Sequence, residues 1–302
     1  MNKKLIIFYN SEAQEFVLKG IKLDSVEIHK LGFNSNLVSK VLYKILFYLN
    51  LYKLSAFFRF DKRTRELLSV NDFRILLFDI GPLSIYQLAN SLIKTSDKHI
   101  FFWNPISTWF GVKNIIKKID TLQKMKFFIS TFDHMDSITY KLPLKINVNR
   151  KFVVECDTIK SDFYFCGRDK GRSDILNKLQ TFLSSCGYRV NFNIIKDKSN
   201  YISLEQNIIN SAESNCIVDI TAPKQVGLTL RPFDALFLKK KLITNNSMIK
   251  NEEFYNENNI FILEKNNLDK IQDFMKKPYI DIDESICNMY EVNCWIENNF
   301  LK

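Results

Sequence analysis

The sequence is poor in the residues that build metal centres, disulfide frameworks and glycine-rich nucleotide loops. It has three histidines, His29, His99 and His134, so a histidine-based metal centre is not expected. Its six cysteines are scattered without a Cys-x-x-Cys pair, which indicates reduced cytosolic thiols and not a structural zinc site. The eight glycines form neither a Gly-x-Gly-x-x-Gly fingerprint nor a Walker A loop. The sequence therefore predicts neither a metal centre nor one of these two glycine-rich nucleotide loops.

Long uninterrupted apolar runs are missing as well. The run Leu5–Tyr9 is too short for the core of a signal peptide and no small-residue cleavage site follows it, so we expect a first buried strand there. The longer apolar stretch 41–60 is interrupted by Lys44, Lys53 and Arg59, which a membrane-spanning helix would not tolerate. We therefore expect that this stretch does not cross a bilayer.

Positive charge is what the sequence has in excess. The formal net charge is +10, which favours an acidic partner: nucleic acid, an anionic membrane face or a phosphorylated substrate. In the stretch 41–65 the cations continue as Lys62, Arg63 and Arg65 among aromatic and aliphatic residues, a mixture typical of a helix on an anionic membrane surface. A core helix with a solvated edge explains the same pattern equally well.

Short apolar strands alternate with helical segments along the whole chain. Strands are predicted at 5–9, 74–79, 99–103, 127–130, 162–166, 190–194, 216–220, 241–244 and 259–263. This alternation indicates an α/β fold with parallel sheets covered on both faces. A polar connection near 145–150 separates two domains, 1–150 and 151–302, each long enough for its own core.

Polar residues follow the predicted strands of the first half. Asn10, Asp79, Asn104 and Asp133 each lie at or just beyond the carboxyl end of a strand. Ligands of parallel sheets bind beyond these ends, so a first-domain site is expected there.

The second half has two segments suited to anions. The turn 167–172 joins a strand to a predicted helix, and glycines with cations at a helix start are what a phosphate site needs, although a charged surface loop is the alternative. Further on, Pro232 suits the first turn of a helix and places a guanidinium at the helix start. The residues predicted to bind a nucleotide diphosphate here are Gly167, Arg168, Lys170, Arg172, Thr229, Arg231 and, for a ribose contact, Asp234.

The order of these motifs resembles the small GT-B glycosyltransferases of bacterial lipopolysaccharide and surface-polysaccharide assembly. The matching stretches are Phe101–Asn104, Phe132-Asp133 with Asp136, Tyr140 and Leu142, Phe165–Arg172, Gly227–Leu236 and Lys241–Thr244. The resemblance implies two Rossmann-like domains facing across a cleft. The second would hold a nucleotide-sugar donor and would end in a closing helix at Tyr290–Leu301. The family often carries Glu where this chain has Asp234.

The resemblance also implies where the partners bind. The first domain would hold a glycolipid or glycan acceptor near Asn10 and Asn104. The protein would be cytoplasmic and peripheral on the inner face of the cytoplasmic membrane, with 41–65 as its contact. The implied reaction is displacement of a nucleoside diphosphate by an acceptor hydroxyl. Arg168, Lys170 and Arg231 would stabilise the leaving group, so no metal and no cofactor are expected.

An inverting reaction of this kind needs a general base. Asp79 is the first candidate, and Asp133 or His134 comes second. Helix capping is the alternative role for Asp79 and for Asp133, and an ordinary surface position is the alternative for His134.

Other classes of function remain open at this point. A non-catalytic assembly partner with a GT-B-like fold is one, because no sequence feature proves the base. A nucleic-acid-binding protein would explain the charge, but no recognised module is visible and the cations lie at strand ends, so no nucleic-acid partner is expected. A GT-A transferase would need a metal-binding acidic pair beside a strand, and Asp281-Ile282-Asp283 lies past the last predicted one.

Overall fold

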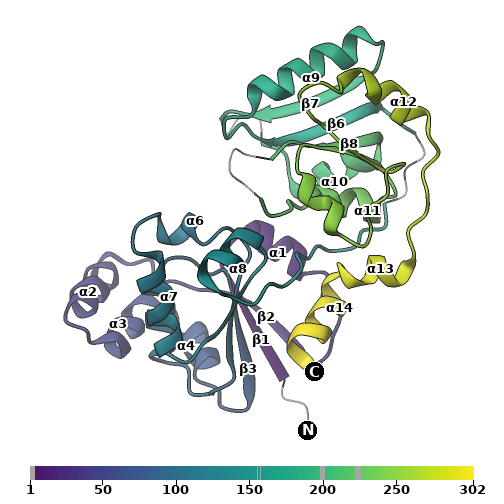
Figure 1. Cartoon of the computed structure of the whole chain (residues 1–302). Helices are drawn as coiled ribbons and strands as arrows, with labels where there is room; N and C mark the ends of the chain where they lie inside the picture. The colour runs from purple at the N-terminus through teal and green to yellow at the C-terminus, as the bar shows by residue number, and fades with distance from the viewer. Residues whose placement is uncertain (1–3, 155, 157, 198–200, 222–225) are drawn as a thin grey trace. The chain divides into compact units, whose positions relative to one another are not determined.

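A computed structural model describes residues 4–154, 156, 158–197, 201–221 and 226–302 (Figure 1). The chain divides into two compact units. Unit 1 comprises Met1–Asn147 with Ile296–Lys302, and unit 2 comprises Val148–Trp295.

Unit 1 is built on a parallel sheet with the strand order β2-β1-β3-β4-β5 (Figure 1). Its strands are β1 (Lys4–Tyr9), β2 (Val26–Lys30), β3 (Phe73–Phe78), β4 (Lys98–Phe102) and β5 (Phe128–Thr131). β1 is almost wholly buried because it lies inside the sheet, which explains its continuous apolar run. β2 is not among the strands expected from the sequence, because this edge strand alternates apolar with polar residues and is only half-buried.

Several helices of unit 1 precede its C-terminal segment. They are α1 (Glu12–Leu18), α2 (Leu37–Tyr48), α3 (Tyr52–Arg59), α4 (Lys62–Leu68), α5 (Leu83–Asn90), α6 (Ser107–Phe110), α7 (Ile115–Lys124) and α8 (His134–Tyr140). The stretch 41–65, expected to lie at a membrane surface, is divided among α2, α3 and α4. The breaks have local causes. Asn50 adopts a left-handed conformation with φ of 58° between α2 and α3. Asp61 begins α4 by accepting a hydrogen bond from the Thr64 N–H at 2.8 Å.

Unit 2 has a second five-stranded parallel sheet, in the order β10-β9-β8-β6-β7. Its strands are β6 (Ser161–Arg168), β7 (Val190–Ile195), β8 (Ser214–Asp219), β9 (Lys241–Thr244) and β10 (Ile260–Ile262). Its helices are α9 (Ser173–Ser185), α10 (Leu204–Ala212), α11 (Arg231–Phe237), α12 (Ile271–Lys276) and α13 (Glu284–Met289), with short 3₁₀ turns η2 (Ser247–Asn251) and η3 (Leu268–Lys270). Phe163 and Phe165 of β6 pack with Leu176, Leu179 and Leu183 of α9, because these leucines recur on one helix face.

The last segment of the chain passes from unit 2 into unit 1. Unit 2 ends at Trp295 within α14 (Val292–Ile296), and a π-helical turn, η4 (Glu297–Leu301), lies in unit 1. The Phe300 ring lies edge-on to His99 with centroids 5.5 Å apart, and Arg74 donates a hydrogen bond to the Phe300 carbonyl. The chain thus returns to unit 1 at its C-terminus.

The expected α/β class with parallel sheets is confirmed, and both units are Rossmann-like in their alternation of strand and helix. Among the described residues, none of the helices combines the length and the apolar character needed to span a bilayer.

Candidate functional site

The turn between β6 and α9 joins positive charge to a helix N-terminus. The chain adopts left-handed conformations at Lys170 (φ 46°) and Gly171 (φ 78°) before α9 begins. The Asp169 carboxylate accepts hydrogen bonds from the backbone N–H groups of Arg172 at 3.1 Å and Ser173 at 2.9 Å, and so caps the helix. Since α9 has 13 residues, the positive end of its dipole adds to the charge of the turn.

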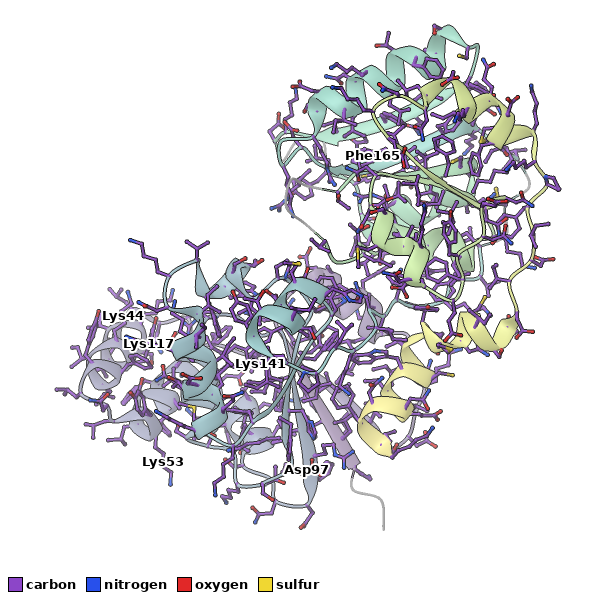
Figure 2. The ribbon with its side chains drawn as sticks, viewed as in Figure 1. Lys44, Lys53, Asp97, Lys117, Lys141 and Phe165 are labelled. Carbon is purple, nitrogen blue, oxygen red and sulfur yellow. The ribbon has the colours of Figure 1, made fainter. Side chains whose placement is uncertain are left out.

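Two arginines from different elements contact one aromatic ring. The ring is that of Phe165, on β6 (Figure 2). The guanidinium carbons of Arg172 and Arg231 lie 5.0 and 4.8 Å from its centroid. Arg172 donates to the carbonyl oxygen of Ile220. Arg231 donates two hydrogen bonds to the carbonyl oxygen of Cys166, from Nη2 at 2.6 Å and from Nε at 3.2 Å. Both side chains therefore satisfy backbone groups near strand ends, a role that the sequence does not predict.

A buried carboxylate balances part of this charge. Burial, and next the charge of Arg231, lower the pKa of Arg172 to about 10, so this guanidinium stays charged at neutral pH. Arg231 forms a salt bridge from Nη1 to Oδ1 of Asp219 at 3.0 Å. Asp219 ends β8, is fully buried and also accepts a hydrogen bond from the Thr229 hydroxyl at 2.8 Å. Asp219 is not among the site residues predicted from the sequence, although it closes an apolar strand just as Asp79 does.

Gly167 makes the approach of the two arginines possible. A Cβ atom at this position would lie 2.3 Å from Nη2 of Arg231 and 2.6 Å from Nη2 of Arg172. Glycine is required because both guanidinium groups come this close to the backbone. Of the predicted donor-binding residues, Gly167, Arg172, Thr229 and Arg231 thus lie together at the carboxyl edge of the unit 2 sheet.

The other two cations of the turn are exposed. The Arg168 guanidinium lies over the Tyr201 ring, 5.4 Å from its centroid. The pKa of Lys170 is lowered, first by partial desolvation and then by the charges of Arg172, Arg168 and Arg231. The neighbouring cations make the potential at this turn positive, which favours a bound anion.

Asp234 points into the protein. It is buried in α11 and accepts a hydrogen bond from Nδ2 of Asn149 at 2.7 Å. Burial raises its pKa to about 7, and the hydrogen bond from Asn149 opposes that rise. Asn149 therefore occupies one oxygen of the carboxylate, and the ribose contact stays a prediction.

Asp79 is the most constrained of the predicted residues in unit 1. It follows β3 in a left-handed conformation (φ 48°) and is fully buried. Its Oδ2 accepts a hydrogen bond from Nδ2 of Asn104 at 2.6 Å, whereas Oδ1 has no hydrogen-bond partner among the described residues. Burial raises the pKa of Asp79 to about 7; Asn104, the Trp109 side chain and the Trp103 backbone favour the charged form but do not cancel the rise. Helix capping does not explain Asp79, because its Oδ2 accepts from Asn104 and its Oδ1 accepts no hydrogen bond from the described N–H groups of α5.

The loop after β1 supports the loop that carries Asp79. Asn10 donates from Nδ2 to the carbonyl oxygen of Ile80 at 3.2 Å. Gln14, in α1, donates from Nε2 to the carbonyl oxygens of Phe78 at 2.9 Å and Asp79 at 3.0 Å. Asn10, Asp79 and Asn104, which the sequence placed at three strand ends, are therefore neighbours in the structure.

Asp133 has the role that the sequence offered as its alternative. Its Oδ1 accepts hydrogen bonds from the N–H groups of Met135 at 2.9 Å and Asp136 at 3.0 Å, so the capping of α8 is confirmed. His134 is the first residue of that helix. Asp136 accepts a hydrogen bond from the Ile106 N–H at 2.7 Å, and burial raises its pKa to about 6.

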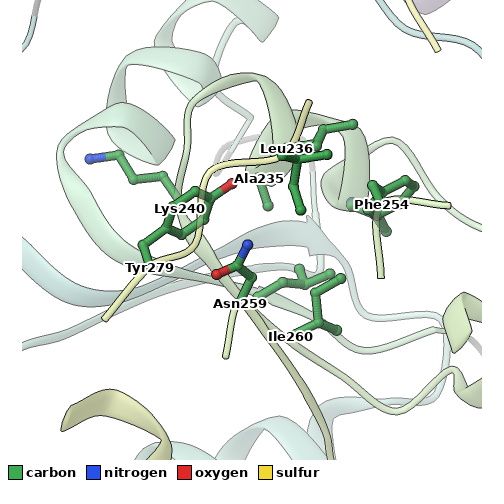
Figure 3. A pocket seen from close by; sticks show the side chains of 10 residues that line it. Ala235, Leu236, Lys240, Phe254, Asn259, Ile260 and Tyr279 are labelled. Carbon is green, nitrogen blue, oxygen red and sulfur yellow. The ribbon is translucent and has the colours of Figure 1, made fainter. Parts of the chain in front are cut away.

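A small cavity in unit 2 lies against α11. It measures about 10 Å³, room for one water molecule, and its walls include Leu236, Lys240, Phe254 and Tyr279 (Figure 3). It is too small for a nucleotide. In the part of the chain that the structure describes, no three His, Cys, Asp or Glu side chains are arranged to hold a metal ion.

Comparison with known proteins gives a weak likeness at the level of fold. No protein-family model matches the chain, and no curated protein matches it. Among solved structures, the chain is similar to Medicago truncatula UGT71G1 in complex with UDP-glucose, with 12% identity, a TM-score of 0.38, and coverage of 100% of this chain and 95% of that chain. A TM-score this low transfers neither activity nor substrate.

We expect Gly167→Ala to lower the free energy of unfolding by about 2 kcal/mol, because the new methyl group displaces two hydrogen-bonded guanidinium groups. Gly187→Ala is the control. Gly187 has φ of +86° and open space around its Cβ position, so that change meets backbone strain alone, about 1 kcal/mol. Urea unfolding measures both variants, and equal losses would contradict the crowding at Gly167.

We expect Asp79→Asn to remove a pH-dependent loss of stability. The folded pKa of about 7 lies above the unfolded value of 3.8. Between these values the folded protein keeps a proton that the unfolded chain releases, so the stability of the wild type falls as pH rises from 4 to 7. The free energy of unfolding of the variant relative to wild type should therefore rise over this range, by an amount on the order of a few kcal/mol. Urea titrations from pH 4 to pH 8 measure the free energy of unfolding of both proteins. If the two free energies change with pH in parallel, the raised pKa of Asp79 is refuted.

Proposed function

We propose that the chain is a glycosyltransferase that uses a nucleotide-sugar donor, and that the donor diphosphate binds at the start of α9. The observation that carries the proposal is the convergence of Arg168, Lys170, Arg172 and Arg231 on this helix N-terminus. Helix N-termini and cations together favour phosphate binding. Arg172 and Arg231 are tied to backbone carbonyls, so we assign the direct phosphate contacts to the exposed Arg168 and Lys170.

In the proposed reaction an acceptor hydroxyl attacks the anomeric carbon of the donor sugar. The bond from that carbon to the diphosphate oxygen breaks, and its electron pair leaves with the nucleoside diphosphate. The cations of unit 2 stabilise this charge, without a metal or another cofactor. The hydroxyl proton passes to Asp79, whose pKa near 7 suits a base at neutral pH. Asp133 and His134 are weaker candidates, because Asp133 caps α8 and His134 lies within it.

A surface of unit 1 supports a lipid-linked acceptor, such as a lipopolysaccharide core or another surface glycan, at the cytoplasmic face of the membrane. The only buried residue of α2 is Ser39, although the helix is mostly apolar. We define the α2–α3 face as the exposed Leu37, Val38, Val41, Ile45, Tyr48, Leu49, Leu51, Leu54 and Phe57. Leu37 and Tyr48 are 76% and 87% exposed.

Cations accompany the α2–α3 face. Lys40, Lys44 and Lys53 are exposed on the same helices, and Figure 2 marks Lys44 and Lys53 there. Lys62 and Arg63 follow at the start of α4. Apolar side chains among cations match an anionic lipid surface, where the chains enter the headgroup region and the cations meet phosphates.

Thermal-shift titration with uridine, thymidine and cytidine diphosphate tests the donor site. We expect one nucleotide to raise the melting temperature without magnesium, and Arg168→Ala and Lys170→Ala each to weaken its affinity about tenfold, since each removes a charged hydrogen bond. Lys178→Ala, an exposed lysine later in α9, is the matched control. Arg231→Ala is a poor test, because it also leaves the buried Asp219 without its ion pair. No shift with any nucleotide would refute the donor site.

Co-sedimentation with phosphatidylethanolamine–phosphatidylglycerol vesicles tests the α2–α3 face. The double change Ile45→Glu with Leu49→Glu should weaken vesicle binding about tenfold or more, because it removes apolar side chains and adds negative charge. Ile209→Glu, an exposed isoleucine on α10, is the control. Nucleotide binding should stay unchanged in all variants. Equal sedimentation of the double variant and wild type would contradict the membrane contact.

A further inference from the structure

Trp109 is the exposed tryptophan of unit 1. It is 39% exposed, whereas Trp103 is 9% exposed and the third tryptophan of the chain, Trp295, is 1% exposed. It lies in α6, which begins three residues after Asn104. The next residue, Phe110, anchors this short helix against Phe102 at the end of β4, with ring centroids 5.6 Å apart. α6 is therefore held at the carboxyl edge of the unit 1 sheet.

The anchoring of α6 brings Trp109 to Asp79. Phe110 also packs edge-on against Tyr86, at 6.4 Å between centroids, and the Tyr86 hydroxyl accepts a hydrogen bond from the Ile80 N–H at 3.1 Å, directly after Asp79. The Trp109 side chain lies within long hydrogen-bonding reach of the Asp79 carboxylate, as do the backbone N–H groups of Trp103 and Asn104, and all three favour its charged form. Among the described residues, however, none gives Oδ1 of that carboxylate a hydrogen bond of normal distance and angle.

A buried carboxylate oxygen without a partner, on a residue in a left-handed conformation, is unfavourable for stability. Such arrangements cluster at active sites and ligand-binding sites. The missing partner here is a hydrogen-bond donor, and the half-exposed indole beside it offers a flat apolar face. A sugar ring supplies both complements, because one face of a pyranose carries C–H bonds that pack on aromatic rings and its edge carries hydroxyl donors.

We propose that Trp109 is the movable wall of an acceptor-sugar subsite. In the ligand-free protein it covers the Asp79 carboxylate. When a pyranose ring of the acceptor binds, the indole turns outwards and stacks on the ring, and a ring hydroxyl donates a hydrogen bond to Oδ1 of Asp79. Asn104 keeps its hydrogen bond to Oδ2 and so holds the carboxylate in place. The proposal rests on the general-base role of Asp79 and names the acceptor chemistry as a sugar hydroxyl.

Acrylamide quenching of tryptophan fluorescence tests stacking, because the quencher reaches Trp109 more readily than the two buried tryptophans. The probes are the methyl glycosides of glucose, galactose, mannose and N-acetylglucosamine. Sorbitol, which has hydroxyls but no ring, is the control. We expect at least one glycoside, and not sorbitol, to lower the quenching constant of the accessible component about twofold or more, and Trp109→Phe to lack that component. Quenching that no glycoside changes would overturn the subsite.

Carbodiimide coupling of glycine ethyl ester to carboxyl groups, mapped by mass spectrometry, tests the cover. Trp109→Ala should raise the labelling rate of Asp79 about tenfold, and Trp109→Phe, which keeps a ring, should raise it much less. Melting temperatures show whether both variants are folded. Equal labelling in wild type and Trp109→Ala would overturn the covering role.

Neither measurement uses a donor, so the two proposals fail separately. A protein that binds a nucleoside diphosphate but shows no glycoside protection refutes the role of Trp109 and leaves the donor site standing. A protein that shows protection but binds no nucleoside diphosphate refutes the glycosyltransferase proposal instead.

Discussion

The unit 2 site is arranged around backbone carbonyl groups near strand ends, which require hydrogen-bond donors. The carbonyls of Cys166 and Ile220 need donors at the sheet edge, and Arg231 and Arg172 supply them. Phe165 contacts both guanidinium groups, which fixes their positions side by side. The positive charge at the start of α9 is thus a consequence of backbone hydrogen bonding, and the exposed cations of the turn add to a field that already exists.

The corresponding edge of the unit 1 sheet carries the opposite chemistry. There a single carboxylate, Asp79, is buried beside Asn104, and burial holds its pKa near neutrality. The proposed reaction requires a group that accepts a proton from the acceptor and cations that receive the negative charge of the leaving group. Each unit provides one of these two electrostatic environments by the same means, polar side chains at the carboxyl ends of parallel strands.

Much of the fold was predictable because the signals are local. Continuous apolar runs such as Leu5–Tyr9 can only be buried, and the proline of α11 begins that helix as its fixed φ favours. The strand-end positions of Asp79 and Asn104 followed from the same pattern. β2 was not predicted, because an edge strand needs no continuous apolar run. The stretch 41–65 is divided among three helices because Asn50 and Asp61 interrupt it.

The sequence by itself determined the α/β class, the strand ends and the residue types available there, since periodicity and helix starts depend on neighbours along the chain. Only the tertiary structure decided what each side chain contacts. Arg231 reaches Cys166, 65 residues away, and Asn104 reaches Asp79, 25 residues away. Such partners decide whether a cation is exposed or tied to a carbonyl and whether a carboxylate titrates near pH 4 or pH 7, because burial and hydrogen bonding arise from packing between distant segments.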